Sequence, residues 1–116
     1  MCSKEDIVRM CHVLDAAKEA VSFAQGKTRK SLDKNRMLVL SLVKDIEIIG
    51  EAATNVSNDC HERFPHIPWK SIINMRNRLI HAYFDINLDI VWQTVTEDLP
   101  SLITELEKIP SLKKKP

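Results

Sequence analysis

Residues 38–56 read LVLSLVKDIEIIGEAATNV, and this stretch carries the clearest structural signal in the chain. Its apolar residues recur at steps of three and four, the spacing that lines one face of an α-helix. The stripe consists of Leu38, Leu42, Ile46, Ile49, Ala53 and Val56, with Val39 and Val43 beside it. The stretch therefore predicts a helix with a broad buried face, preceded by Ser31 or Asp33 as its cap and ending near Val56.

The segment before this helix predicts another one. Apolar residues repeat with the same spacing over residues 4–25, and Ser3 with Asp6 has the spacing of a capping box. Gly26 is a natural residue to end that helix. The polar and basic residues 27–34 then link the first helix to the second.

The second half of the chain predicts two more helices. Residues 57–68 contain two prolines and several cap-type residues, so we expect an ordered loop there. A third helix is expected over residues 68–82. The fourth begins after a cap at Asp85 or Asn87, and Pro100 inside it should kink the helix because proline removes a backbone hydrogen bond.

Four helices with short links predict an all-α, up-down four-helix bundle. Only two glycines occur in the chain, and no Asn-Gly or Asp-Gly dipeptide is present, which argues against β-hairpins. The length suits one domain, which we place at residues 1–110. Residues 111–116 form a basic C-terminal tail that we expect to fray.

Charge and cysteine content restrict the functional class. The chain carries 17 Lys plus Arg and 16 Asp plus Glu, whereas domains that hold long nucleic acids by bulk electrostatics usually have a strong basic excess. Its three cysteines match no disulfide or zinc framework, and residues 1–6 lack the apolar run of a signal peptide. These features predict a cytoplasmic protein with reduced cysteines, and they leave room for a small phosphate-binding site.

The expected third helix carries an unusual group of polar residues. On a helical wheel Arg76 lies in the middle of the apolar arc, where a buried partner or another subunit should face it. Asn77 and His81 are one turn apart, so the amide can orient the imidazole. Tyr83 returns to the Arg76 side if the helix extends that far. A cation, an amide, an imidazole and a phenol thus fall within about two turns.

A purely structural interpretation of the same residues is also open. Arg76 would then be a structural ion-pair partner of Glu47 or Glu51, and His81 a core or helix-end histidine with satisfied hydrogen bonds. Structural ion pairs also produce such patterns.

The segment RNRLIHAYF, residues 76–84, resembles the R-x4-H-x-Y signature of HepT-like proteins, minimal members of the HEPN ribonuclease superfamily and toxins of MNT/HEPN toxin-antitoxin pairs. IEIIGEAA (46–53), FPHIPWKSIINMRN (64–77) and LDIVWQTVTEDLPSL (88–102) also resemble this family, in the family's order. Several matched blocks at matched spacing are more specific than a lone R-x4-H pattern.

The resemblance implies a fold, an activity and a partner. The fold is a HEPN four-helix bundle that forms a homodimer, in which two R-x4-H motifs meet at one composite site. Arg76 and His81 would be catalytic and Asn77 supporting, while a cognate MntA-like nucleotidyltransferase antitoxin would modify Tyr83 with AMP. Glu47 and Glu51 match the family's pattern on the second helix and are possible ligands of Arg76.

The implied reaction suits these residue types without a metal or other cofactor. RNA supplies its own nucleophile in the 2′-hydroxyl, so the protein must move protons and stabilise charge on the phosphorane. Histidine, with an ordinary pKa of about 6.5, can transfer the protons. The fork of an arginine matches phosphate oxygens. A 2′,3′-cyclic phosphate and a 5′-hydroxyl are the expected products.

Two rival interpretations belong to other functional classes. In the first, the chain is a non-catalytic HEPN module that binds a nucleotide or docks a nucleotidyltransferase. In the second it is a structural helical adaptor, which leaves the position of Arg76 unexplained. Cys60, His61 and His66 share one loop, but no second ligand pair follows at metal spacing, so we expect no zinc there.

Overall fold

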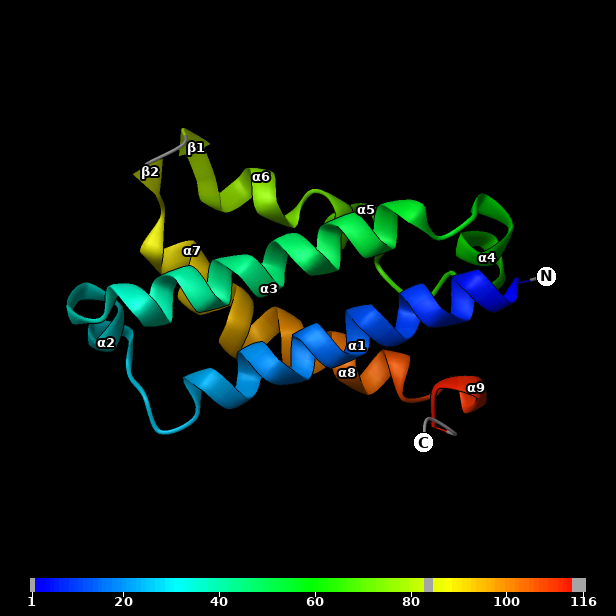
Figure 1. Cartoon of the computed structure of the whole chain (residues 1–116), viewed down its shortest axis with the longest axis horizontal. Helices are drawn as coiled ribbons and strands as arrows, with labels where there is room; N and C mark the ends of the chain where they lie inside the picture. The colour runs from blue at the N-terminus through cyan, green and yellow to red at the C-terminus, as the bar shows by residue number, and fades with distance from the viewer. Residues whose placement is uncertain (1, 83–84, 114–116) are drawn as a thin grey trace.

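The computed structural model describes residues 2–82 and 85–113 and is an elongated bundle of 44 × 28 × 20 Å (Figure 1). The all-α expectation is confirmed, with one short hairpin added. The elements are α1 (Lys4–Ala24), α2 (Arg29–Lys34), α3 (Arg36–Asn55), α4 (Asn58–Arg63), α5 (Trp69–Ile73), α6 (Met75–Leu79), β1 (Ile80–Ala82), β2 (Asp85–Ile86), α7 (Leu88–Gln93), the π-helix η1 (Thr94–Asp98), α8 (Leu99–Leu106) and α9 (Pro110–Lys113).

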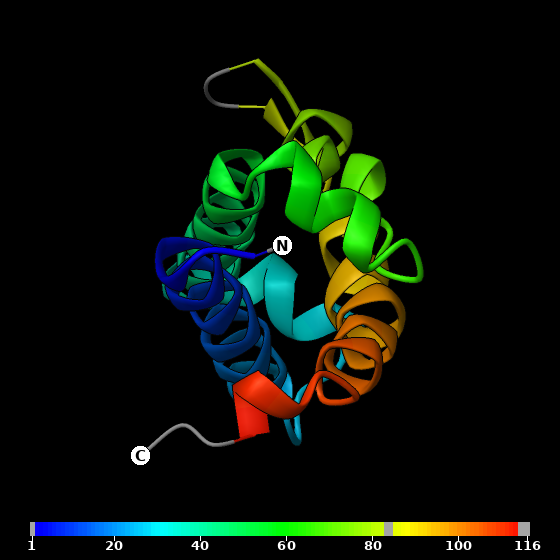
Figure 2. The same cartoon turned by 90° about the vertical axis from the view of Figure 1, so that its right-hand side faces the viewer.

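The two long helices α1 and α3 run antiparallel and form one side of the bundle (Figure 1). Seen end-on, they face α7, η1 and α8 across the core, and the β1–β2 hairpin stands away from the bundle (Figure 2). Ser3 and Asp6 form both halves of the expected capping box. Gly26 has φ +75°, the left-handed conformation that favours glycine after a helix end.

The cap of α3 differs from the prediction. Neither Ser31 nor Asp33 caps this helix, because both lie inside the additional short helix α2. Asn35 is the cap, and its side-chain oxygen accepts a 3.0 Å hydrogen bond from the Leu38 N–H. Asparagine is among the best N-cap residues, but the polar run before α3 offers several candidates of similar quality.

The expected loop over residues 57–68 contains the helix α4, which Ser57 caps. The buried Asp6 carboxylate joins this cap to the start of α1: it accepts bonds from the Ser57 N–H at 2.9 Å and the Ser57 hydroxyl at 2.7 Å. A disulfide between Cys2 and Cys60 closes the same corner. The expectation of unpaired cysteines is therefore wrong for these two, because the fold brings together residues that are 58 apart in sequence.

The expected third helix over residues 68–82 is broken and shorter. α5 ends at Ile73, because its C-cap Asn74 has φ −90° and ψ 0°, outside the α-helical region, and α6 ends at Leu79. Residues 80–82 then form β1, which pairs antiparallel with β2. The Asn87 N–H donates to the Leu79 carbonyl at 2.7 Å and closes the base of this hairpin.

The last long helix has the expected cap and an irregularity near Pro100. Asn87 accepts a hydrogen bond from the Ile90 N–H at 3.1 Å. Residues 94–98 form a π-helix, in which the Leu99 N–H bonds to the Thr94 carbonyl five residues back. Because Pro100 has no N–H, the ordinary ladder cannot continue there, and the wider turn accommodates this loss.

The start of the C-terminal tail that we expected to fray is helical. Residues Pro110–Lys113 form α9, and Leu112 is buried against the bundle, while residues 114–116 of the predicted tail lie outside the described residues. In the described part of the chain, no helix is long and apolar enough to cross a membrane.

Candidate active site

Arg76 lies on α6 and forms an ion pair with α3. Its Nε donates a 3.1 Å hydrogen bond to Glu47 Oε2, and the two side chains are 48% and 38% exposed. The helical wheel placed Arg76 at the centre of an apolar face, and that position is wrong. The break at Asn74 gives the core positions of α6 to Met75 and Leu79 instead.

A cavity of about 310 Å³ gathers four of the predicted residues. Arg76 and Asn77 line it from α6, while Glu47 and Glu51 line it from α3. Gly50 of α3 faces the end of α5, where a Cβ atom would lie in ordinary van der Waals contact, 3.5 Å from the carbonyl oxygens of Ile72 and Ile73. The remaining lining residues are Gly50, Thr54 and Ile73.

One arginine and two glutamates lie on the wall of this cavity, so its charged side chains carry a formal net charge of −1. Within the described residues, Arg76 makes no hydrogen bond other than the one from Nε. The terminal nitrogens of its guanidinium therefore retain donor capacity for an anion. An arginine with two free terminal nitrogens can bind phosphate oxygens in a bidentate manner.

The predicted residues His81 and Tyr83 come two and four positions after the last residue of α6, Leu79. The backbone of His81 belongs to β1, so the expected one-turn relation between Asn77 and His81 on a single helix is wrong. The helix α6 ends at Leu79, and the first strand of the hairpin begins at Ile80. Tyr83 lies outside the described residues, and its role stays a prediction.

The loop residues that we discounted as zinc ligands have other partners. Cys60 is in the disulfide, and the His61 ring stacks on Trp69 with 4.4 Å between ring centroids. The His61 Nε2 atom is also 3.1 Å from the Ala53 carbonyl oxygen. These contacts fasten α4 to α3 and α5.

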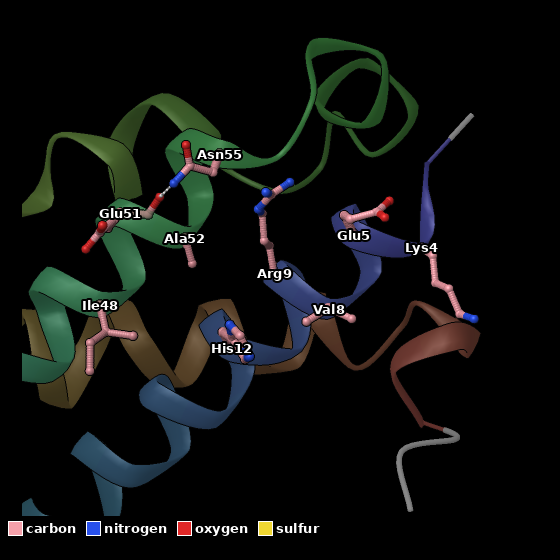
Figure 3. Close-up of a pocket in the computed structure, with 9 residues that line it drawn as sticks. All are labelled: Lys4, Glu5, Val8, Arg9, His12, Ile48, Glu51, Ala52 and Asn55. Atoms are coloured by element: carbon pink, nitrogen blue, oxygen red, sulfur yellow. Dashed lines mark hydrogen bonds between the residues drawn. The ribbon is translucent and has the colours of Figure 1, made fainter.

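Two features were missed by the sequence analysis. One is the corner formed by Asp6, Ser57 and the disulfide, for which sequence spacing gave no signal. The other is a groove of about 580 Å³ between α1 and α3, with Val8 and His12 on one wall and Ile48 and Ala52 on the other (Figure 3). The full lining is Lys4, Glu5, Val8, Arg9, His12, Ile48, Glu51, Ala52 and Asn55.

Comparison with known proteins identifies the family. The family model described as "Ribonuclease HepT-like" matches residues 13–109, which include the whole Arg76-to-His81 motif. The chain belongs to the HepT-like ribonuclease family. The resemblance inferred from the sequence blocks is therefore confirmed.

Individual relatives of this HepT-like protein carry names of the same class. It is 35% identical to "Putative RNase MJ1380" of Methanocaldococcus jannaschii over 90% of this chain and 97% of the relative. It is 45% identical to "Probable ribonuclease HepT" of Thermococcus cleftensis over 60% of this chain and 63% of the relative. It is 33% identical to "Putative RNase TTE0752" of Caldanaerobacter subterraneus over 84% of this chain and 88% of the relative. Among solved structures, none matches this chain significantly.

Proposed function

We propose that this HepT-like protein is a metal-independent endoribonuclease toxin that acts as a homodimer. A cognate nucleotidyltransferase antitoxin neutralises it by transferring AMP to Tyr83. The observation that carries the proposal is Arg76, which shares an open cavity with Asn77 and two glutamates and keeps its terminal nitrogens for an anion. The R-x4-H pattern provides the proposed partner of that arginine, His81.

The proposed reaction is an internal transesterification of RNA. A histidine takes the proton of the 2′-hydroxyl, whose oxygen attacks the neighbouring phosphorus. A second proton donor protonates the departing 5′-oxygen, so the products are a 2′,3′-cyclic phosphate and a 5′-hydroxyl. Arg76 stabilises the negative charge that develops on the phosphorane. Asn77 supports the site, and Glu47 holds the guanidinium by its Nε.

A homodimer supplies what one protomer lacks. One His81 can act as the base or the acid, whereas two copies related by a two-fold axis provide both. Arg76 is half exposed on the surface of the protomer, which suits a residue that faces another subunit. We place α6 near the two-fold axis. Light scattering at micromolar concentration should give the mass of a dimer, and a monomer mass would contradict the composite site.

The experiment that tests the proposed activity compares the parent protein with His81→Ala on total RNA in the presence of EDTA. We expect the parent to cleave RNA and the variant to be inactive while retaining its helical circular dichroism. Because the proposed substrate is RNA and the proposed partner uses a nucleotide, we place the reaction in the cytoplasm. Cleavage that disappears with EDTA would contradict the metal-independent mechanism.

The second candidate function is a non-catalytic HEPN module that binds a nucleotide or docks the nucleotidyltransferase. The ion pair between Arg76 and Glu47 favours it, because a paired arginine is already partly neutralised. Binding of AMP or ATP by a protein that leaves RNA intact would support this alternative.

A further inference from the structure

A small cavity between α1 and α3 is lined by four side chains that can ligate a metal ion. Its volume is about 220 Å³, and it adjoins the groove of Figure 3, with which it shares His12 and Ile48. His12, Asp15 and Glu19 line it from α1, and Asp45 lines it from α3. The three α1 residues are three and four positions apart, so they share one face of that helix.

Asp45 is the unusual member of this group. It is only 2% exposed, and its Oδ2 atom has no hydrogen-bond partner in the described structure. Burial raises the pKa of Asp45 to about 7, and the neighbouring Glu19 carboxyl adds to the rise. A buried carboxyl oxygen without a partner costs free energy, which a bound cation would offset.

No basic side chain of the described residues neutralises Asp45 or Glu19. No lysine or arginine of the described residues forms an ion pair with Asp45 or Glu19. The facing titratable groups from α1 are His12, Asp15 and Glu19. The cavity therefore offers negative charge and one imidazole to whatever enters it.

We propose that this cavity binds one divalent metal ion of the Mn²⁺ type, with Asp45 and Glu19 as its carboxylate ligands and His12 as a nitrogen ligand. Helical bundles build metal sites from carboxylates and histidines that project inward from facing helices. Carboxylate oxygens suit Mn²⁺ and Mg²⁺, and the imidazole favours the transition metal over Mg²⁺.

Binding requires the α1 side chains to reorient. In the described residues, the one group of three ligand-type side chains whose donor atoms already lie within 4.8 Å of one another is Cys2, Asp6 and Cys60, at the disulfide corner. His12 and Glu19 are exposed and sit on the same helical face, so a change of rotamer brings them toward an ion at Asp45. The ion would then cross-link α1 to α3.

This site is separate from the proposed ribonuclease site. The cavity at Asp45 and the cavity at Arg76 share no lining residue. The ion has no step in the RNA cleavage, and the inference stands whether or not the chain is a ribonuclease. Its expected effect is on the stability of the α1–α3 pair.

The test uses Mn²⁺ itself on full-length protein that has been freed of metals with EDTA and of any affinity tag. Titration followed by electron paramagnetic resonance, which detects free Mn²⁺, should give one bound ion per chain. Asp45→Asn and Glu19→Gln should each weaken binding at least tenfold. Glu62→Gln, which removes an exposed carboxylate on α4, is the matched control and should bind as the parent does.

Two further measurements keep the test decisive. Mn²⁺ should raise the Tm of the parent but not that of Glu19→Gln, and it should broaden the NMR signals of His12 and Ile48 before those of other residues. Asp45 is buried, so its variant can fail to fold, whereas Glu19 is exposed and its replacement should not affect folding. No binding at millimolar Mn²⁺, equal weakening in Glu62→Gln, or undiminished binding in Glu19→Gln would each overturn the proposal.

Discussion

Arg76 Nε donates a 3.1 Å hydrogen bond to Glu47 Oε2, and this contact joins α6 to α3 beside the cavity that also holds Asn77 and Glu51. Both side chains of the pair are partly exposed, so water and salt screen their Coulomb attraction, and the pair contributes little to the free energy of folding. Its consequence is geometric. The contact holds the guanidinium through Nε, and no other described residue bonds to its terminal nitrogens.

Replacing Arg76 by alanine should remove most of the RNA cleavage. Loss of one charged contact to a transition state typically lowers the rate roughly 10²- to 10³-fold. Arg78→Ala is the matched control, since Arg78 is an equally exposed arginine on the same helix and pairs loosely with Asp98 at 3.9 Å. Its rate should equal that of the parent. Equal losses in both variants would indicate a general effect of charge on RNA binding, against the specific role of Arg76.

Glu47→Ala tests whether the glutamate positions or blocks the arginine. In the positioning account, losing a hydrogen bond to a charged group should lower kcat roughly ten- to a hundredfold, because such bonds contribute about 1.5–3 kcal/mol. Glu47→Gln should recover much of the rate, since the amide oxygen can still accept from Nε. An increase in kcat for Glu47→Ala would instead mean that Glu47 competes with the substrate for Arg76.

Asp6 should make the bundle sensitive to acid. Burial acts to raise the pKa of this carboxyl, but the hydrogen bonds from Ser57 and Ser3 outweigh it and lower the pKa from 3.8 to about 2. The stabilisation is thus present above about pH 4 and is lost as the pH falls toward 2, where the folded state must also take up the proton.

Urea unfolding between pH 5 and pH 2 measures this contribution of Asp6. The free energy of unfolding of the parent should fall toward pH 2, and that of Asp6→Asn should fall less. At neutral pH, Asp6→Ala should cost roughly 2–3 kcal/mol, because the Ser57 donors lose a charged acceptor. Asp59→Asn, an exposed acid on α4, is the control. Identical pH profiles for the parent and Asp6→Asn would disprove this role.

The sequence predicted the parts of the fold that depend on local periodicity. The long stripes of α1 and α3 gave both helices to within a few residues, and Asn87 was among the two expected caps of the last helix. It did not predict the break at Asn74 or the hairpin after Leu79, because the residues from Trp69 to Ala82 keep a helical apolar pattern across both. Tertiary pairing of β1 with β2 overrides that pattern.

Four of the predicted residues, Glu47, Glu51, Arg76 and Asn77, line one cavity, but their arrangement differs from the one expected. The sequence offers both Glu47 and Glu51 as ion-pair partners of Arg76, and Arg76 pairs with Glu47. The sequence analysis placed Arg76 at the centre of an apolar face because a wheel assumes one unbroken helix, whereas the break makes Met75 the buried residue. The Cys2–Cys60 disulfide depends on a contact across 58 residues, and spacing rules carry no information about such a contact.

Tyr83 should be the residue that the antitoxin modifies. AMP attached to the phenol adds a phosphodiester anion and a nucleoside, which would occupy the place of the substrate phosphate near Arg76. Intact-mass spectrometry after co-expression with the cognate nucleotidyltransferase should show mass increments of AMP, and Tyr83→Phe should show none. An unmodified protein that is inactive in the complex would mean that the antitoxin acts by occlusion.

The chemistry of the RNA ends tests the central claim most directly. Purified protein in EDTA is incubated with an RNA oligonucleotide and with its all-2′-O-methyl counterpart, and the products are analysed by mass spectrometry. Our account predicts a 2′,3′-cyclic phosphate and a 5′-hydroxyl from the RNA, no cleavage of the 2′-O-methyl strand, and no products from Arg76→Ala or His81→Ala. Products with a 3′-hydroxyl and a 5′-phosphate, or cleavage of the 2′-O-methyl strand, would contradict it.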